Sequence, residues 1–476
     1  MHSPSEPPAR GLSRLASRIP RPDWLSHSRG RMAAFFLLYM SEGIPYGFST
    51  IAIATQMRRH GVGPAEIGLF VGVLYLPWGL KFLAGPFVDT FGSLRFGRYR
   101  LWIVLMQLGL AASLLLAVPI DFATGMGLFT TVLLVHNMFG AVQDVAIDAL
   151  AVNVLKDNER GAANGYMWAG YAAGQALGGA GVLYLSQIMP FRMTFVFVAA
   201  VLLLLLVTVS LPLREPKRED RPAPGVNPFV KAGRDIVDFV RDSGRAFVSS
   251  RGALVGVAFA LLPTGAYALG LALYSNLAVE LGMSDTDIAN LGVASQMVSI
   301  FACIGGGTIS DRVGRRRTLA LSMIGLSIPT LALAWTLQQA GLIHAIGAGA
   351  VPGGPGAAVV PAAVVTTFWG LVILYQFFNG VMYSVSIALY MDVTTPRVAA
   401  TQFTAYMAIA NLCTSYSAVW QGQSIARFGY PATLVIDGLI GLVAISLLPF
   451  MTRTPLRKRL ATPTAAAPAA IPESIP

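Results

Sequence analysis

Long apolar segments separated by short polar ones run through most of the chain. Uncharged runs such as 101–120, 196–213 and 362–391 each supply the ~20 apolar residues with which a helix crosses a hydrocarbon core of ~30 Å. Because lipid offers the backbone no hydrogen-bonding partner, each run predicts a membrane-spanning helix. Punctuation by Gly, Pro and charged residues predicts twelve spans, at 32–55, 65–88, 100–120, 123–153, 160–187, 191–213, 252–279, 286–309, 318–338, 361–392, 399–426 and 431–452.

Composition supports the same class of protein. Hydrophobic residues make up 55% of the chain and charged residues only 12%, too few to cover a soluble domain. The net charge of +11 lies in short clusters between apolar segments, which argues against nucleic-acid binding. Cys303 and Cys413 fall inside apolar segments, so no disulfide framework and no metal site are expected. Without a nucleophile constellation or a phosphate-binding loop, we expect neither an enzyme nor a cofactor.

The distribution of Lys and Arg predicts the orientation of the spans. If the N-terminus is cytoplasmic, 29 of the 34 Lys and Arg residues fall on the cytoplasmic side. Both termini are therefore expected inside. Residues 1–31 lack the apolar core of a cleaved signal and are expected to form a disordered cytoplasmic arm. The Ala- and Pro-rich residues 453–476 are expected to form a disordered cytoplasmic tail.

A repeated loop pattern divides the spans into two comparable halves. The loop after the second span and the loop after the eighth each combine Gly, Asp and Arg, and a second echo places Arg160 and Arg397 at the starts of spans five and eleven. The loop residues are Gly85, Asp89, Arg98 and Arg100, and then Gly307, Asp311, Arg312, Gly314, Arg315 and Arg316. The pattern predicts an all-α membrane protein with six-helix halves at 32–213 and 252–452.

The segment between the halves, 214–251, is charged and carries one amphipathic stretch. Phe229, Ile236, Val240 and Phe247 lie on one helical stripe, which predicts a linker helix lying on the membrane surface.

The second loop motif, Gly307-x-x-x-Asp311-Arg312-x-Gly314-Arg315-Arg316, resembles the cytoplasmic loop signature of the major facilitator superfamily. Physically, Asp311 is placed to cap a helix start in the other half, and the arginines to pair with acids and lipid phosphates. Such a latch would stabilise the state closed to the cytoplasm. We predict a gating role for the loop residues of both halves and for Arg160.

The first-half loop resembles a narrower branch of this superfamily. Leu80-Lys81-Phe82-Leu83-x-x-Pro86-x-x-Asp89, Gln143-Asp144-Val-Ala-Ile-Asp148, Glu159-Arg160-Gly161-Ala162 and Ala400-Thr401-Gln402-Phe403 are similar to AmpG-like muropeptide permeases and acetyl-coenzyme A transporters. The chain departs from the muropeptide permeases at Asn153, where they tend to carry an acid. The resemblance implies a multi-pass transporter of the bacterial inner membrane, and we expect it to act as a monomer.

Charges inside the spans are the best candidates for coupling, since an unpaired charge in lipid costs several kcal/mol. Glu42, in span one, is the predicted proton-coupling residue, because a buried carboxyl group can load and release protons. Lys81 is predicted to bind an anionic substrate or to pair with Glu42. Asp144 and Asp148 lie on one face of span four and need a shared proton or a cation. His136 is either a proton relay or a hydrogen-bonded core histidine.

The cation that pairs with Asp144 and Asp148 could come from one of three arginines, Arg98, Arg100 or Arg160. The aspartates would then form a gate rather than a binding site.

Polar and aromatic side chains near mid-membrane suit a cavity for a large amphiphilic or sugar-bearing ligand. Each of them is equally compatible with an interhelical hydrogen bond. The predicted substrate-binding set is Lys81, Tyr46, Asn137, Tyr171, Gln175, Tyr274, Tyr375, Gln376, Asn379 and Asn411. Asp392 and Asp437 are interpreted as structural. Span five carries Gly170-x-x-x-Gly174-x-x-x-Gly178, which favours close helix packing.

The sequence thus predicts a secondary transporter that works by alternating access and is driven by a proton gradient. Import of a small anionic or amphiphilic solute such as a muropeptide is favoured. Siderophore uptake and proton-driven export are the alternatives within transport. Outside transport, a membrane sensor or scaffold is the remaining alternative.

Overall fold

The computed structural model describes residues 24–92, 96–122, 124–156, 159–215, 227–248, 251–343, 360–394 and 399–451. The predicted tail 453–476 and most of the predicted arm 1–31 lie outside these residues. All the secondary-structure elements of the described residues are helices, which confirms the all-α fold class. Among the described helical segments, eight are long and apolar enough to cross a membrane.

The first half consists of six helical spans, four of them assembled from shorter pieces. They are α2 (Ser28–Gly47) with η1 (Phe48–Ile53) and α3 (Ala54–Arg59); α4 (Pro64–Gly79) with η2 (Lys81–Leu83) and α5 (Gly85–Thr90); α6 (Arg98–Ala117); α7 (Met126–Val154); α8 (Arg160–Ala176) with η3 (Leu177–Gly181) and α9 (Val182–Leu185); and α10 (Phe191–Leu205) with η4 (Leu206–Ser210).

The second half repeats this plan after the linker helix α11 (Pro228–Val248). Its elements are α12 (Arg251–Leu261) with η5 (Ala268–Gly270) and α13 (Ala272–Glu280); α14 (Asp285–Val313); α15 (Arg315–Gln339); α16 (Ala362–Val393); and α17 (Ala399–Val443) with η7 (Ala444–Phe450). Spans eleven and twelve both lie in α17, where Gly429 has a non-helical φ of 81°.

Two predicted spans are interrupted. Span two breaks at Leu80, directly after α4 ends at Gly79, and Lys81 therefore lies in the short turn η2 rather than in a regular helix. Span seven breaks between α12 and η5, where Pro263 and Gly265 stand together and Gly265 has a φ of +95°. Asp437 stabilises this break by accepting a hydrogen bond of 2.9 Å from the Ala268 amide.

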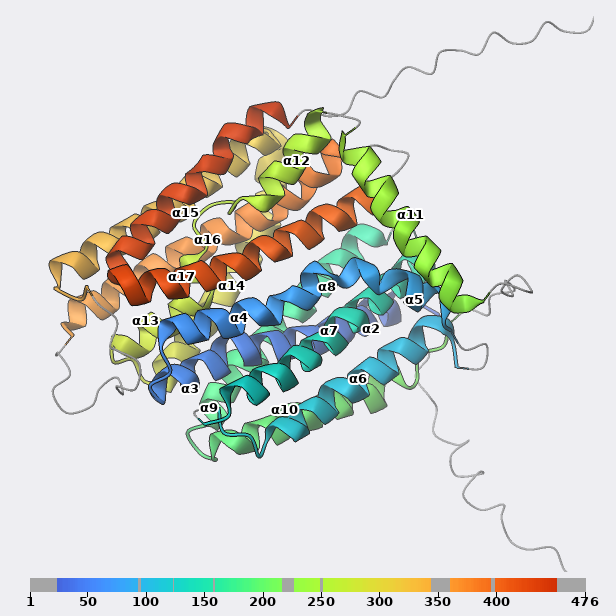
Figure 1. Ribbon diagram of the computed structural model, residues 1–476, viewed down its shortest axis with the longest axis horizontal. Coiled ribbons are helices and arrows are strands. Elements are labelled where there is room, and N and C mark those ends of the chain that lie inside the picture. Colours follow the sequence, from blue (N-terminus) through green and yellow to red (C-terminus); the bar gives the residue numbers. More distant parts are fainter. Residues whose placement is uncertain are drawn as a thin grey trace, which may run out of the picture.

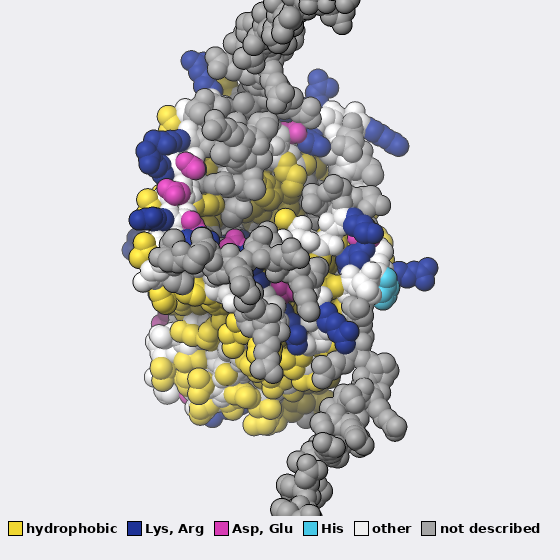
Figure 2. All heavy atoms as spheres, turned by 90° about the vertical axis from the view of Figure 1, so that its right-hand side faces the viewer, with side chains coloured by type: hydrophobic (Ala, Val, Ile, Leu, Met, Phe, Trp, Pro, Cys, Tyr) yellow, Lys and Arg dark blue, Asp and Glu magenta, His cyan; other side chains and the backbone are white. Residues whose placement is uncertain are grey.

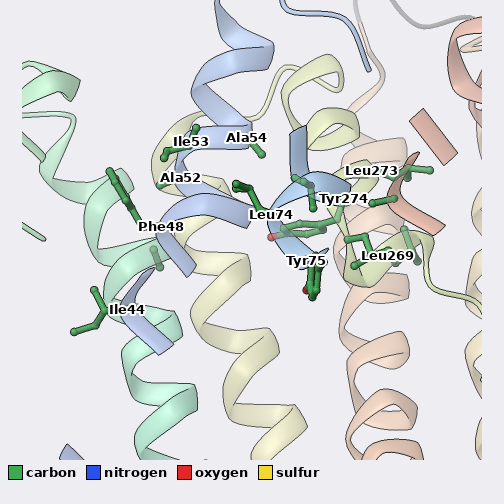
Figure 3. Packing of buried hydrophobic residues seen from close by; sticks show 14 of the residues in the cluster. Ile44, Phe48, Ala52, Ile53, Ala54, Leu74, Tyr75, Leu269, Leu273 and Tyr274 are labelled. Carbon is green, nitrogen blue, oxygen red and sulfur yellow. The ribbon is translucent and has the colours of Figure 1, made fainter. Parts of the chain in front are cut away.

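The spans run side by side, and α11 lies across one end of the bundle (Figure 1). We call this end the α11 end and the opposite end, where α3, α9 and α13 meet, the far end. The two halves pack against each other along α4 and α17 and along η3 and α14. Figure 3 shows the buried apolar core near this seam, where Leu74 and Tyr75 of the first half lie close to Leu269 and Tyr274 of the second.

Helices α2 and α8 pack so closely that glycine is required between them. A Cβ atom at Gly174 would lie 2.2 Å from the Met40 carbonyl oxygen, and one at Gly170 would lie 2.0 Å from that of Phe36. Because these obstacles are backbone atoms, no side-chain rotation relieves the clash. The glycine pattern of span five therefore serves helix packing, as predicted.

We expect Gly174→Ala to lower the free energy of unfolding by about 1–3 kcal/mol, because α2 and α8 must separate to admit the methyl group. Gly165→Ala is the matched control, since it lies in the same helix and a Cβ atom there meets nothing within 4 Å. This control should be neutral or stabilising by up to about 1 kcal/mol. Thermal unfolding of the purified variants measures both effects. Equal stability of the two variants would contradict the packing.

Candidate functional site

A buried cluster of charged side chains joins α2, η2 and α7. Lys81 Nζ lies 2.6 Å from Asp144 Oδ2, and the side chains are only 17% and 10% exposed. The Tyr39 hydroxyl donates a hydrogen bond to Asp148, one turn further along α7. Glu42 is buried and interacts electrostatically with Lys81 and with both aspartates. We call these five residues the Lys81 cluster.

Local structure explains how the Lys81 cluster forms. Asp144 and Asp148 are four residues apart in α7, so their carboxyl groups lie on the same face of that helix. Tyr39 and Glu42 are three residues apart in α2 and face them in the same way. Because span two breaks at Leu80, the Lys81 side chain lies where it can reach both α2 and α7.

Within the Lys81 cluster, three carboxyl groups share one ammonium group. The described contacts of Lys81 join it to Asp144. Glu42 Oε1 is buried and has no hydrogen-bond partner among the described residues. Charged groups without partners are expensive to bury in a membrane. The arrangement therefore has room for a further cation, a proton or a hydrogen-bond donor at Glu42.

The predicted pairings differ from those in the structure. Lys81 pairs with Asp144 rather than with Glu42. The described side-chain contacts of Arg98 and Arg100 are with other partners: Arg98 lies over the Tyr99 ring, and Arg100 donates a hydrogen bond to the Leu211 carbonyl oxygen. Their backbone amides donate hydrogen bonds to Glu215. The reason is that both arginines begin α6, on the outer rim of the bundle, where the acid after span six caps the helix start. The side chain of Arg160 lies outside the described residues.

His136 lies two turns before Asp144 on α7 and faces α6 instead of the Lys81 cluster. Its Nδ1 lies 2.9 Å from the Ser113 hydroxyl oxygen and 3.1 Å from the Leu110 carbonyl oxygen. Its Nε2 is buried and has no hydrogen-bond partner among the described residues, so both predicted roles stay open.

A chain of aromatic contacts runs from α2, which carries part of the Lys81 cluster, to the second half. The Tyr46 and Tyr75 hydroxyl groups are hydrogen-bonded, and the Tyr46 ring centroid lies 5.7 Å from that of Tyr171. Trp168 packs edge-on against Tyr171 at 5.7 Å and against Tyr383 of α16 at 4.9 Å. Two predicted binding residues, Tyr46 and Tyr171, are thus brought together, and Tyr75 joins them unpredicted.

The remaining predicted binding residues divide into two groups. Three lie at contacts between helices near the seam: Gln175 accepts a hydrogen bond of 2.5 Å from Gln296, and Asn137 and Asn411 contact the side chain and the carbonyl oxygen of Trp78, respectively. Four make hydrogen bonds within the second half. Tyr274 donates to the Ile288 carbonyl oxygen and Tyr375 to that of Ala266, and these bonds between spans are the alternative role predicted for them. Asn379 donates to Gln376 within α16, so this bond lies inside one helix.

Two ion pairs, absent from the predicted gating set, join the halves at the far end. Arg58 of α3 is fully buried and lies 2.8 Å from Glu280 of α13, which also accepts a hydrogen bond from Tyr430. Arg59 lies 2.5 Å from Asp285 at the start of α14. The count of Lys and Arg on each side of the membrane placed these two arginines outside and gave them no partner. Their acidic partners lie more than two hundred residues away along the chain, so the sequence pattern did not link them. Removing one partner of a pair as buried as Arg58 with Glu280 costs several kcal/mol, whereas Arg59 is partly exposed.

At the α11 end, the described contacts of the predicted loop residues stay within one half. Arg315 pairs with Asp392 at 2.7 Å, and Arg316 donates to the Met451 carbonyl oxygen. Gly314 turns the chain between α14 and α15 with a φ of +98°. In the first half, Asp89 accepts a hydrogen bond of 3.2 Å from Tyr99. The side chain of Asp311 lies outside the described residues, so its predicted capping role is untested.

Gly85 and Gly307 are the other glycines of the two loop motifs. Gly85 begins α5 and Gly307 lies near the end of α14; a Cβ atom at either would meet nothing within 4 Å. Arg312 is exposed in the last turn of α14.

An ion pair outside the spans ties the start of α2 to the loop before α8. Arg31 contacts Glu159 through two nitrogens, at 2.5 and 3.0 Å. This hydrogen bonding lowers the pKa of Glu159 from its usual 4.5 to about 2. Its contribution to stability is therefore complete above pH 4.5 and is lost as the pH falls toward 2.

A bundle of two six-helix halves around a buried charged cluster is the fold of a membrane transporter and not of an enzyme. The chain belongs to the Major Facilitator Superfamily, whose family model matches residues 32–366.

Curated relatives place the chain in the AmpG-like branch of this family. It is 22% identical over 440 residues to "Putative transporter AmpG 4" of Rickettsia felis, covering 89% of this chain and 97% of that protein. It is 27% identical over 159 residues to the "Anhydromuropeptide permease" of Escherichia coli K12, covering 33% and 32%. An uncharacterized protein of Haemophilus influenzae is 28% identical over 260 residues, 54% of this chain and 59% of that protein.

Solved structures are similar in fold at low sequence identity. The xylose transporter XylE from E. coli, in an inward-open conformation, gives a TM-score of 0.66 at 12% identity, covering 90% of this chain and 98% of that one. A mutant form of the nucleoside transporter NupG gives 0.62 at 11% identity, covering 88% and 99%. These likenesses confirm the twelve-helix fold.

We expect Lys81→Met to lower the free energy of unfolding by about 3–5 kcal/mol, because it leaves the Asp144 carboxylate buried without its partner. The double variant Lys81→Met with Asp144→Asn should recover most of this loss, since both charges are then removed together. Thermal unfolding of the wild-type protein, Lys81→Met, Asp144→Asn and the double variant completes the double-mutant cycle that isolates the interaction energy of the pair. A double variant no more stable than Lys81→Met would contradict a pairwise ion pair.

Proposed function

We propose that this chain imports a small anionic or amphiphilic solute, such as a muropeptide, together with protons. The observation that supports the proposal is the excess of acid in the Lys81 cluster, where three carboxyl groups face one lysine. Electrical neutrality in a membrane requires two further positive charges or two bound protons. A site that must take up protons to become neutral is suited to proton coupling.

The ion pair between Lys81 and Asp144 suggests how substrate and proton are linked. An anionic substrate group that binds Lys81 displaces Asp144, whose carboxylate then lacks its cation and favours a proton. Glu42 and Asp148 lie within electrostatic reach and can pass that proton on. In this account Lys81 is the anion contact, and the three acids carry the protons. The hydroxyl of Tyr39 holds Asp148 in place.

Alternating access follows from the different contacts at the two ends of the bundle. The far end is closed by Arg58 with Glu280 and by Arg59 with Asp285. At the α11 end, the described ion pairs Arg315 with Asp392 and Arg31 with Glu159 each lie within one half. We infer that the far-end ion pairs form a gate that must open when the halves rock.

The distribution of Lys and Arg indicates which end of the bundle faces the cytoplasm. Figure 2 shows Lys and Arg side chains gathered on the α11 end, and basic residues favour the cytoplasmic side of a membrane. We infer that the α11 end and both chain termini are cytoplasmic, in the inner membrane of a bacterium. With that orientation the far-end ion pairs form an outer gate.

The proposal is tested with the full-length protein in liposomes, using an anhydromuropeptide, an iron-siderophore and acetyl-coenzyme A as probes. We expect accumulation of one of these solutes when the medium on the far-end side of the protein is made acidic. Each pH unit is worth about 1.36 kcal/mol per coupled proton, so two units allow up to ~100-fold accumulation for each proton that is coupled. Glu42→Gln should reduce accumulation to about the level reached without a gradient.

The matched control is Asp121→Asn, because Asp121 is an exposed carboxylate outside the Lys81 cluster and pairs peripherally with Arg192. This variant should retain wild-type uptake. If Glu42→Gln still accumulates the solute against its gradient in response to pH, the coupling role of Glu42 is wrong. Uptake of a probe without any response to pH would refute proton coupling while leaving transport intact.

A further inference from the structure

The linker helix α11 contacts both halves through aromatic side chains. Phe239 stacks on Phe82, the neighbour of Lys81, with ring centroids 5.4 Å apart. Phe247 packs against Tyr406 of α17 at 5.1 Å. In Figure 1, α11 runs obliquely across the ends of the spans and reaches α12 at one end and α5 at the other. The helix is therefore fixed at the level where the spans leave the bilayer.

A second apolar strip on α11 is not covered by the bundle. Ala232 is fully buried on the inner side, and Phe229 packs against Phe91 of the first half with ring centroids 4.8 Å apart. Four apolar side chains further round the helix are between 49% and 80% exposed. At 100° per residue they fall within one third of the helix circumference. We call them the outer strip; they are Val230, Val237, Val240 and Val248.

The arginines of α11 lie together on one side of its polar face. Arg234, Arg241 and Arg245 lie within a ~40° arc that directly borders the outer strip. Asp238, Lys231, Asp242 and Asp235 follow in that order round the helix toward the inner face. The flank beside the outer strip is therefore basic, whereas the flank nearer the inner face is mixed and mainly acidic.

We propose that α11 binds anionic phospholipids, with the outer strip among the acyl chains and the three arginines on the headgroup phosphates. The chain crosses a membrane, so lipid is present at the ends of its spans. Apolar side chains this exposed favour the interface, and guanidinium groups beside them bind phosphate with two parallel hydrogen bonds. Three basic residues near an anionic surface favour binding roughly a hundredfold. The proposal is independent of the transported solute.

Spin labels on the outer strip test this directly. Val237→Cys or Val240→Cys is introduced into a full-length protein in which Cys303 and Cys413 are replaced by alanine, and the labelled protein is reconstituted in vesicles. Accessibility is measured to oxygen, which partitions into lipid, and to a water-soluble nickel chelate. In phosphatidylcholine with phosphatidylglycerol, we expect high oxygen and low nickel accessibility, with a clear shift toward water in phosphatidylcholine alone.

The charged residues of α11 supply matched variants. Replacing Arg234, Arg241 and Arg245 by Gln should abolish the effect of phosphatidylglycerol, whereas replacing Asp235, Asp238 and Asp242 by Asn should preserve or strengthen it. Labels exposed to nickel in both vesicles would overturn the proposal. Labels equally deep in both vesicles would overturn the preference for anionic lipid. Labels shielded from both reagents would show that protein, and not lipid, covers the outer strip.

Discussion

The buried ion pair between Lys81 and Asp144 is the interaction on which the rest of the account depends. Lys81 reaches Asp144 only because span two breaks at Leu80 and the lysine turns inward there. The pair draws η2 onto α7, and the carboxyl groups of Glu42 and Asp148 are held beside it by α2. A single cation in a membrane interior thereby organises three helices and leaves an excess of acid that must be neutralised.

The close packing of α2 on α8 gives this charged group a rigid surrounding. Gly170 and Gly174 let the two backbones meet, so α2 cannot shift without moving α8. Along α8, the aromatic contact from Tyr171 through Trp168 reaches Tyr383 of the other half. A change of charge in the Lys81 cluster therefore has a short physical route to the seam between the halves. The far-end ion pairs resist opening on the other side.

The sequence predicted the parts of this arrangement that depend on local periodicity. Apolar runs predicted the spans, and the four-residue spacing of Asp144 and Asp148 predicted a shared face. The predicted candidate partners of that pair were Arg98, Arg100 and Arg160, whereas Asp144 pairs with Lys81. Charge type alone does not show which cation a helix break will turn inward. Arg58 was missed for a related reason: its partner Glu280 is brought near only by the packing of one half on the other.

The predicted binding set illustrates the same limit. A tyrosine in a membrane span has the same sequence signature whether it lines a cavity or donates to a backbone carbonyl. Tyr375 donates to Ala266 because span seven is broken there and exposes carbonyl oxygens, a feature set by Pro263 and Gly265. The break also explains Asp437, which was interpreted as structural and caps the exposed amide of Ala268.

The central claim is that the excess acid of the Lys81 cluster holds protons under the conditions of transport. Infrared difference spectroscopy of the reconstituted protein measures the protonation of these carboxyl groups directly. A protonated carboxyl group has a C=O stretching band that a carboxylate lacks, and this band shifts in heavy water. The account predicts such a band at neutral pH in the wild-type protein and its loss or reduction in Glu42→Gln. A wild-type spectrum without any protonated carboxyl band, or one unchanged by Glu42→Gln, would contradict it.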